Sequence, residues 1–233
     1  MDGKNIPNHV AIIPDGNRRW AKKHGKVSWQ GHLEGAKRVE EVASTALAGG
    51  VKYFTIWAGS EANLTKRSKV EVAVLVRLVV ATLKRLEKSK DIVRNQVRVR
   101  VIGRSVQLLK SDKLAQAITS VEKKTGGYDK HHFTILFGYD GQSDMERAVN
   151  KLIKNGGSVS REDISSALST GELPPVDLVI RTGGEPHNSA GFMMWQAAES
   201  QLYFTEKYWP EFTSAEFSKA LSEYARRERR LGK

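Results

Sequence analysis

The chain has 233 residues, contains no cysteine and carries a formal net charge of +12. The lack of cysteine excludes disulfide bonds and thiolate catalysis, and no apolar run approaches the roughly 20 residues of a membrane-spanning helix. The first residues also lack the apolar stretch of a signal peptide, so we expect a soluble, cytoplasmic protein with anionic partners. No linker rich in Pro, Gly or Ser divides the sequence, which favours a single domain over residues 1–233.

The opening segment, His9-Val-Ala-Ile-Ile-Pro-Asp15-Gly-Asn-Arg-Arg19-Trp20, is the most informative part of the chain. Residues 10–13 are typical of a short buried strand, residues 15–17 of a turn, and residues 18–23 of the start of a helix. Free N–H groups and the helix dipole favour a phosphate at such a start, and arginines add paired donors. A carboxylate repels a phosphate unless a cation such as Mg²⁺ bridges them, so Asp15 predicts metal-assisted diphosphate chemistry. The local pattern equally fits an ordinary turn with solvated arginines.

The rest of the sequence alternates strand and helix patterns. Helices are expected at residues 33–47, 70–86, 111–126 and 214–230, with capping boxes at Ser143 and Ser160. Strands are expected at residues 51–57, 97–102, 133–137 and 177–180. This alternation predicts an α/β fold in which helices flank a mostly parallel central sheet. Ligands bind outside the carboxyl ends of such strands, where the following polar residues fall: Asp15, Ser60, Asp140 and Arg181.

Two further stretches have more than one interpretation. The wide apolar face of residues 70–86 is typical of a core helix, and it also suits the wall of a pocket for an aliphatic chain. The arginine cluster at 226–230 is more typical of a solvated helix end than of a nucleic-acid patch. No stacking aromatics or known module point to nucleic acid, and we expect none to be bound.

The familiar phosphate loops are absent, since neither G-x-x-x-x-G-K-[ST] nor G-x-G-x-x-G occurs. The opening segment and a second segment, Asp177-Leu-Val-Ile-Arg181-Thr-Gly-Gly-Glu185, form a specific family pattern when both occur in one chain. With the blocks that accompany them in order, the chain resembles the cis-prenyltransferase family, also called undecaprenyl diphosphate synthases, over essentially its whole length. The accompanying blocks are Gly31-His32, residues 60–67 with Glu71, residues 192–196, residues 202–205 with Trp209-Pro210, and residues 226–232.

The resemblance implies an enzyme that condenses isopentenyl diphosphate onto an allylic diphosphate, such as farnesyl or geranylgeranyl diphosphate, to make a Z-polyprenyl diphosphate. It implies Mg²⁺ as cofactor, Asp15 as its ligand, Asp15 and Asn17 as catalytic residues, and an apolar tunnel for the product. The residues expected to bind substrate are Gly16, Arg18, Arg19, Trp20, His32, Ser60, Asn63, Arg67, Glu71, Arg181, Glu185, His187, Ser189, Arg230 and Gly232. Family members are typically homodimers, and Arg230-Leu-Gly232 resembles an element donated across the dimer.

Three positions depart from the family pattern. Ser28 and His187 stand where arginines are common, and Gln201 stands where an acid usually assists magnesium or the closing arginine network. A histidine at position 187 should make isopentenyl diphosphate binding weaker and sensitive to pH. The departures leave open an irregular coupling of two short allylic diphosphates, as in lavandulyl-type synthases.

Two rival functions come from other classes. The first is a non-catalytic subunit of a prenyltransferase complex, against which the retained Asp15 argues, and the second is a basic nucleic-acid-binding protein. A lipid product would also allow peripheral contact with a membrane.

Overall fold

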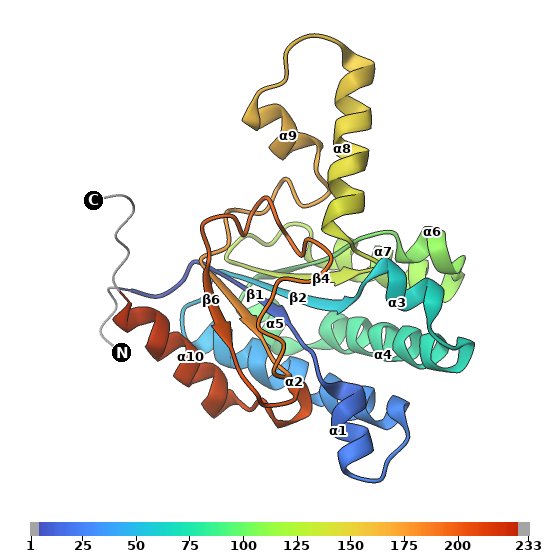
Figure 1. The fold of residues 1–233 in the computed structure, drawn as a ribbon, viewed down its shortest axis with the longest axis vertical. Coiled ribbons are helices and arrows are strands. Elements are labelled where there is room, and N and C mark those ends of the chain that lie inside the picture. The colour runs from blue at the N-terminus through green and yellow to red at the C-terminus, as the bar shows by residue number, and fades with distance from the viewer. Residues whose placement is uncertain (1–4, 228–233) are drawn as a thin grey trace.

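The computed structural model describes residues 5–227, which fold around a single six-stranded sheet (Figure 1). The strand order is β3-β4-β2-β1-β5-β6, and every pair of neighbours is parallel. The strands are β1 (His9–Ile13), β2 (Tyr53–Gly59), β3 (Val97–Ile102), β4 (His131–Phe137), β5 (Leu178–Arg181) and β6 (Gln201–Phe204). The expected α/β class with a parallel sheet is confirmed.

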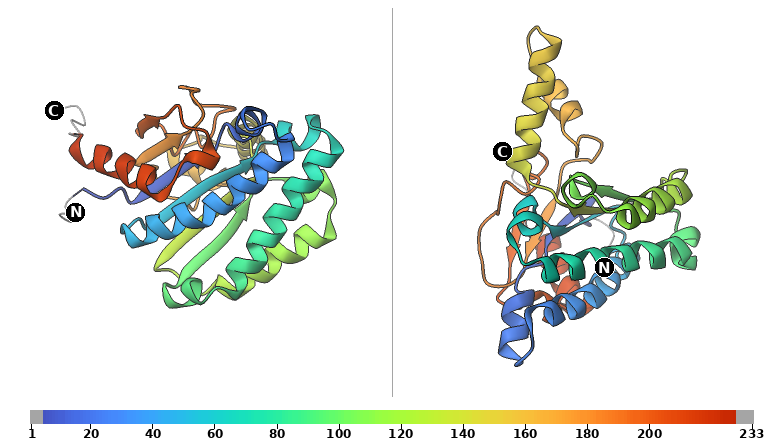
Figure 2. Two further views of the ribbon diagram at one scale, coloured as in Figure 1. Left: turned by 90° about the horizontal axis from the view of Figure 1, so that it is seen from below. Right: turned by 90° about the vertical axis from the view of Figure 1, so that its right-hand side faces the viewer.

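Helices connect consecutive strands except β5 and β6, which are joined by irregular chain over residues 182–200. The helices are α1 (Asn17–Lys23), α2 (Ser28–Ala48), α3 (Glu61–Lys66), α4 (Lys69–Lys88), α5 (Lys90–Arg94), α6 (Ser105–Leu109), α7 (Asp112–Thr125), α8 (Gly141–Asn155), α9 (Arg161–Ala167) and α10 (Ser214–Arg226), with a 3-10 turn η1 (Trp209–Glu211). In two directions of view, α8 and α9 stand out from the body at one end, and α1 lies at the other (Figures 1 and 2). None of the helices in the described part of the chain is long and apolar enough to cross a membrane.

The two faces of the sheet are covered differently. Alternate residues of β1 point to opposite faces, so Val10 and Ile12 join the core beneath the helices, whereas Ala11 and Ile13 join a second core. Helices α2, α4, α7 and α10 supply the first core. The second is covered largely by irregular chain between α9 and β6, which contributes Phe192 and Met193. Fully burying an apolar side chain of this size contributes about 1.5–3 kcal/mol.

Local capping signals are largely confirmed. Ser111 caps α7 and Ser160 caps α9, each accepting a hydrogen bond from the backbone N–H three residues on. The predicted capping box at Ser143 is wrong, because α8 begins three residues earlier. Its cap is Asp140, whose carboxylate accepts the Ser143 N–H at 3.0 Å. Aspartate is as good a cap as serine, and its position allows an additional turn of helix.

The connections of β1 and β5 open a crevice between them. The chain leaves β1 for β2 on one side, while it leaves β5 for β6 on the other. Ile13 pairs in register with Arg181, so both strands end at the same level. Ligands of open α/β sheets bind at such a switch point, and Asp15 follows directly after it.

Candidate active site

A cavity of about 1160 Å³ opens at the carboxyl ends of the central strands and extends between α2, α4 and the sheet. Its polar lining includes Asp15, Asn17, Arg18, Arg19, His32, Ser60, Asn63, Arg67, Arg181 and Ser189. Its apolar lining includes Val39, Ile56, Leu75, Leu78, Val79 and Ile135. Helix α4 contributes Leu83 to the core, which confirms the first interpretation of residues 70–86, and it contributes Leu75 to the cavity wall. That the cavity takes an aliphatic chain stays a prediction.

Asp15 is held between two arginines. Its Oδ2 lies 3.0 Å from Nη2 of Arg181, and its Oδ1 lies 3.2 Å from Nη2 of Arg19. Arg181 is only 5% exposed, whereas about a third of the Asp15 side chain (34%) remains accessible from the cavity side. The carboxylate is thus fixed in orientation while one part of it stays open to a ligand.

The turn after Asp15 has a backbone that needs glycine. Gly16 has φ +95°, and a Cβ there would lie 2.5 Å from Cδ1 of Tyr208. Asn17 starts α1 and donates from Nδ2 to the Pro14 carbonyl at 3.1 Å. Its buried Oδ1 has no hydrogen-bond partner among the described residues, and it occupies space that a Cβ at Gly35 would fill. An unpaired buried acceptor at a cavity is suited to a donor brought by a ligand.

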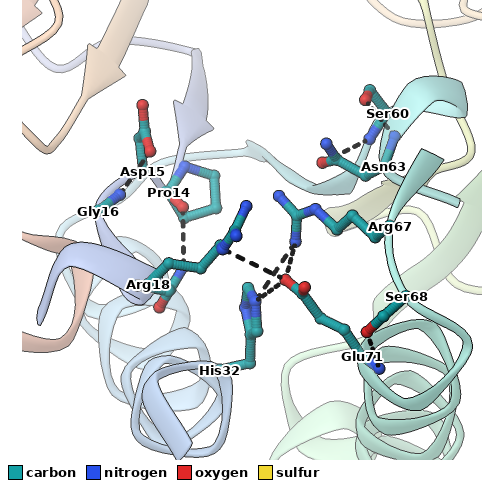
Figure 3. A network of polar contacts seen from close by, with 11 residues as sticks. Pro14, Asp15, Gly16, Arg18, His32, Ser60, Asn63, Arg67, Ser68 and Glu71 are labelled. Carbon is teal, nitrogen blue, oxygen red and sulfur yellow. Dashed lines mark hydrogen bonds and ion pairs between the residues drawn. The ribbon is translucent and has the colours of Figure 1, made fainter. Parts of the chain in front are cut away.

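Four polar side chains from three parts of the chain meet beside α2 (Figure 3). Oε1 of Glu71 lies 3.0 Å from Nη1 of Arg67, 3.1 Å from Nε2 of His32 and 3.8 Å from Nε of Arg18. Burial lowers the pKa of His32, although its hydrogen bond to Glu71 opposes this shift. His32 is therefore mostly neutral at pH 7 and donates from Nε2 to the carboxylate.

Ser60 and Asn63 cap the neighbouring helix α3. Ser60 Oγ accepts the Asn63 N–H at 3.0 Å, and Asn63 Oδ1 accepts the Ser60 N–H at 3.3 Å. Both line the cavity, and the same short segment leads into Arg67. The reciprocal cap fixes the start of the segment that carries these side chains.

The segment after β5 forms the opposite wall of the polar end. Arg181 donates from Nη1 to the His187 carbonyl at 2.7 Å, which places its second nitrogen at Asp15. Glu185 accepts from Arg19 at 3.1 Å, and the His187 ring lies 4.0 Å from Glu185. Ser189 lines the cavity, whereas the side chains of Glu185 and His187 are 43% and 57% exposed and lie outside its lining.

Several expected site residues lie elsewhere. Trp20 turns away from the cavity, stacking on His24 at 4.3 Å beneath the Lys26 ammonium. Gln201 sits on β6, outside the cavity lining, with a buried Oε1 that has no partner among the described residues. Asp140, expected at the same edge, caps α8 instead. Arg230 and Gly232 lie outside the described residues.

Two cations at the cavity were not anticipated. Lys22 and Lys26 line it beside Ser28. The signal that could have found them is the basic run from Arg18 to Lys26, which contains no acid. These lysines supply positive charge close to the position where the family commonly carries an arginine.

The side chains at the polar end of the cavity fit a metal site in which one carboxylate of the protein holds the ion. No group of three or more His, Asp or Glu side chains in residues 5–227 could hold a metal ion. Mg²⁺ commonly takes only one or two carboxylates, with substrate phosphates and water completing its shell. The single accessible carboxylate of Asp15 fits that arrangement and would hold the ion against a bound diphosphate.

A parallel α/β fold whose cavity joins a cationic, carboxylate-bearing end to an apolar wall defines an enzyme that handles diphosphate esters of hydrocarbon chains. The family described as "Putative undecaprenyl diphosphate synthase" matches residues 13–232. The chain belongs to this family, the cis-prenyltransferases, and is a prenyl-transferring enzyme.

Known proteins are similar to this chain over almost its whole length. An isoprenyl transferase of Fusobacterium nucleatum is 40% identical, over 98% of this chain and 97% of its own length. A tritrans,polycis-undecaprenyl-diphosphate synthase (geranylgeranyl-diphosphate specific) of Pyrococcus horikoshii is 38% identical, over 98% of this chain and 88% of its own length. The crystal structure of lavandulyl diphosphate synthase from Lavandula x intermedia, in complex with dimethylallyl diphosphate, superposes with a TM-score of 0.90 at 32% identity, covering 98% of this chain and 99% of that one.

Proposed function

We propose that residues 1–233 form one catalytic domain that condenses isopentenyl diphosphate onto an allylic diphosphate with Mg²⁺, making a Z-polyprenyl diphosphate. The observation that carries this proposal is the cavity itself. It joins the Asp15 and Arg181 pair to an apolar wall made by α2, α4 and β2. A diphosphate with a hydrocarbon tail needs both ends, and each buried CH₂ contributes about 0.8 kcal/mol to holding the tail.

The chain's own residues account for the chemistry. The allylic C–O bond breaks, and Arg18, Arg19 and Lys22 supply positive charge where the departing diphosphate gains charge. When bound, Mg²⁺ would neutralise part of the same charge. The new C–C bond forms at the isopentenyl double bond, which then loses a proton. Asp15 and Asn17 both line the cavity at this end, and the Asp15 carboxylate would accept this proton.

The second diphosphate is assigned to the opposite wall. Arg181 is nearly buried and held by the His187 carbonyl and Asp15, while Ser189 adds a hydroxyl. Holding two diphosphates side by side removes most of the entropic cost of a bimolecular step.

A second candidate is the irregular coupling of two short allylic diphosphates. The observation that favours it is His187, whose ring lies outside the cavity lining, so this wall offers one buried guanidinium. The similar structure of a lavandulyl diphosphate synthase in complex with dimethylallyl diphosphate adds support.

One assay tests both candidates. Purified protein with Mg²⁺ is given labelled isopentenyl, dimethylallyl, geranyl or farnesyl diphosphate, singly and in pairs, and products are separated by chain length. Elongation in pairs that include isopentenyl diphosphate supports condensation, and products from allylic diphosphates alone support irregular coupling. No product from any pair would refute both.

We also propose a homodimer. The edge strand β6 exposes Leu202 (44%) and Phe204 (37%), and an uncovered apolar edge is typical of an interface. Arg230 and Gly232 would cross to the partner's isopentenyl site. Sedimentation of the wild type and of Leu202→Glu tests this, with a dimer expected for the first and a monomer for the second.

Peripheral contact with a membrane is proposed through the lipid product, and vesicle cosedimentation with and without substrates tests it.

A further inference from the structure

Glu71 lies behind the cationic wall of the active site. Arg18, His32 and Arg67 line the cavity, whereas Glu71 does not, and its side chain is only 10% exposed. A single carboxylate oxygen, Oε1, contacts all three of these side chains, at 3.8, 3.1 and 3.0 Å. A carboxylate in this place cannot bind a diphosphate directly, because the two anions repel each other.

The fold places Glu71 where a carboxylate is stabilised. It occupies the first turn of α4, a helix of 20 residues, and Ser68 Oγ accepts its backbone N–H at 3.3 Å. The helix dipole favours a negative charge at this end, and two guanidinium groups stabilise the carboxylate further. Replacing it with a neutral group would remove the negative charge beside Arg67, which is only 22% exposed.

The charge balance at this wall depends on Glu71. Arg18 and Arg67 are positive, and His32 is mostly neutral because burial lowers its pKa. With Glu71 the four side chains carry a net charge of about +1, and without its charge they would carry about +2. Pyrophosphate is a product that must leave after every condensation, so excess affinity for it would slow turnover.

We propose that Glu71 is a positioning residue which orients Arg18, His32 and Arg67 toward the allylic diphosphate and cancels one of their charges, so that pyrophosphate is released. The inference rests on the proposed condensation. It differs from a role in which Glu71 merely anchors the segment between α3 and α4, because the two roles predict opposite changes in affinity.

The test is the binding of inorganic pyrophosphate with Mg²⁺, measured by titration calorimetry. In Glu71→Gln the amide can still accept from Arg67, but the charge is gone. We expect the dissociation constant to fall about tenfold. Steady-state kinetics should show a lower KM for the allylic diphosphate and a lower kcat, with stronger inhibition by pyrophosphate.

Two further variants separate charge from structure. Glu34→Gln removes an equal charge from α2 outside the cavity, where Glu34 pairs with Lys37 at 2.9 Å, and should leave pyrophosphate affinity unchanged. Arg18→Gln removes a cation from a side chain that is 58% exposed, so its fold is secure, and should weaken binding. Combining Arg18→Gln with Glu71→Gln should restore affinity close to that of the wild type.

The results that overturn the inference are distinct from failure of the proposed function. Unchanged or weaker pyrophosphate binding in Glu71→Gln, equal tightening in Glu34→Gln, or loss of the folded state by circular dichroism would each assign Glu71 a structural role only. A wild type that neither binds pyrophosphate nor makes product would overturn the proposed condensation and this inference with it.

Discussion

A pair of phenylalanine rings lies on β2 and β4, next along the strands to residues that line the main cavity, and lines a second cavity. The second cavity, of about 550 Å³, lies between the C-terminal halves of α2 and α4, and its lining includes Ala43 and Leu47. Phe54 and Phe133 line it and face each other in register, with ring centroids 5.6 Å apart. The next inward-facing pair along the same strands, Ile56 and Ile135, lines the main cavity instead. We therefore predict that these rings stop a growing hydrocarbon chain.

Removing one ring should lengthen the product. Phe133→Ala is expected to join the two cavities. Burying an additional five-carbon unit of the product there would contribute about 4 kcal/mol of binding free energy, at about 0.8 kcal/mol per CH₂. This is sufficient to favour the longer product by more than a hundredfold if no other step interferes. The cost is about 3–5 kcal/mol of stability for a buried phenylalanine, a large part of the total for a domain. Phe133→Leu is the milder variant and should shift the product in the same direction.

Product length is measured by reversed-phase chromatography of dephosphorylated products, with the same primer and the same ratio of substrates for each variant. Leu47→Ala is the matched control, because Leu47 lines only the second cavity and should leave product length unchanged. An unaltered distribution in folded, active Phe133→Ala and Phe133→Leu would refute the reasoning that these rings end the chain.

Three other changes have defined outcomes. Asp15→Ala should lower kcat/KM about a thousandfold, with some loss of stability because the nearly buried Arg181 loses its carboxylate partner, and undiminished turnover would disprove its role. Burial lowers the pKa of His9 from 6.5 to about 4, so the unfolded chain binds a proton first as pH falls. Urea unfolding should show that the free energy of unfolding of the wild type drops by up to about 3 kcal/mol between pH 6.5 and 4. If the free energy of unfolding of His9→Gln depends on pH as steeply as that of the wild type, this explanation is wrong. His187→Arg should lower the KM for isopentenyl diphosphate several-fold; if KM does not move, this side chain does not reach the substrate.

Local chemistry made much of the fold predictable. The burial of β1 follows from its unbroken apolar run, and the caps at Ser111 and Ser160 depend on groups three residues apart. The meeting of Asp15 with Arg181 was predictable from their places after two strands, because parallel strands end at one edge. Strand β6 was not predicted, whereas the equally short β5 was, because β5 is fully buried and β6 is a partly exposed edge strand.

The amino-acid sequence by itself determined the class of fold, the family and the chemical character of the site, because strand and helix periods, turn residues and ordered motifs are local properties. Only the tertiary structure decided which side chains act together. It turned Trp20 away from the cavity, joined Glu71 to His32 from a different helix, and set Phe54 against Phe133 across two strands. Such contacts depend on how elements distant in sequence pack, and packing depends on the shapes of all the neighbours at once.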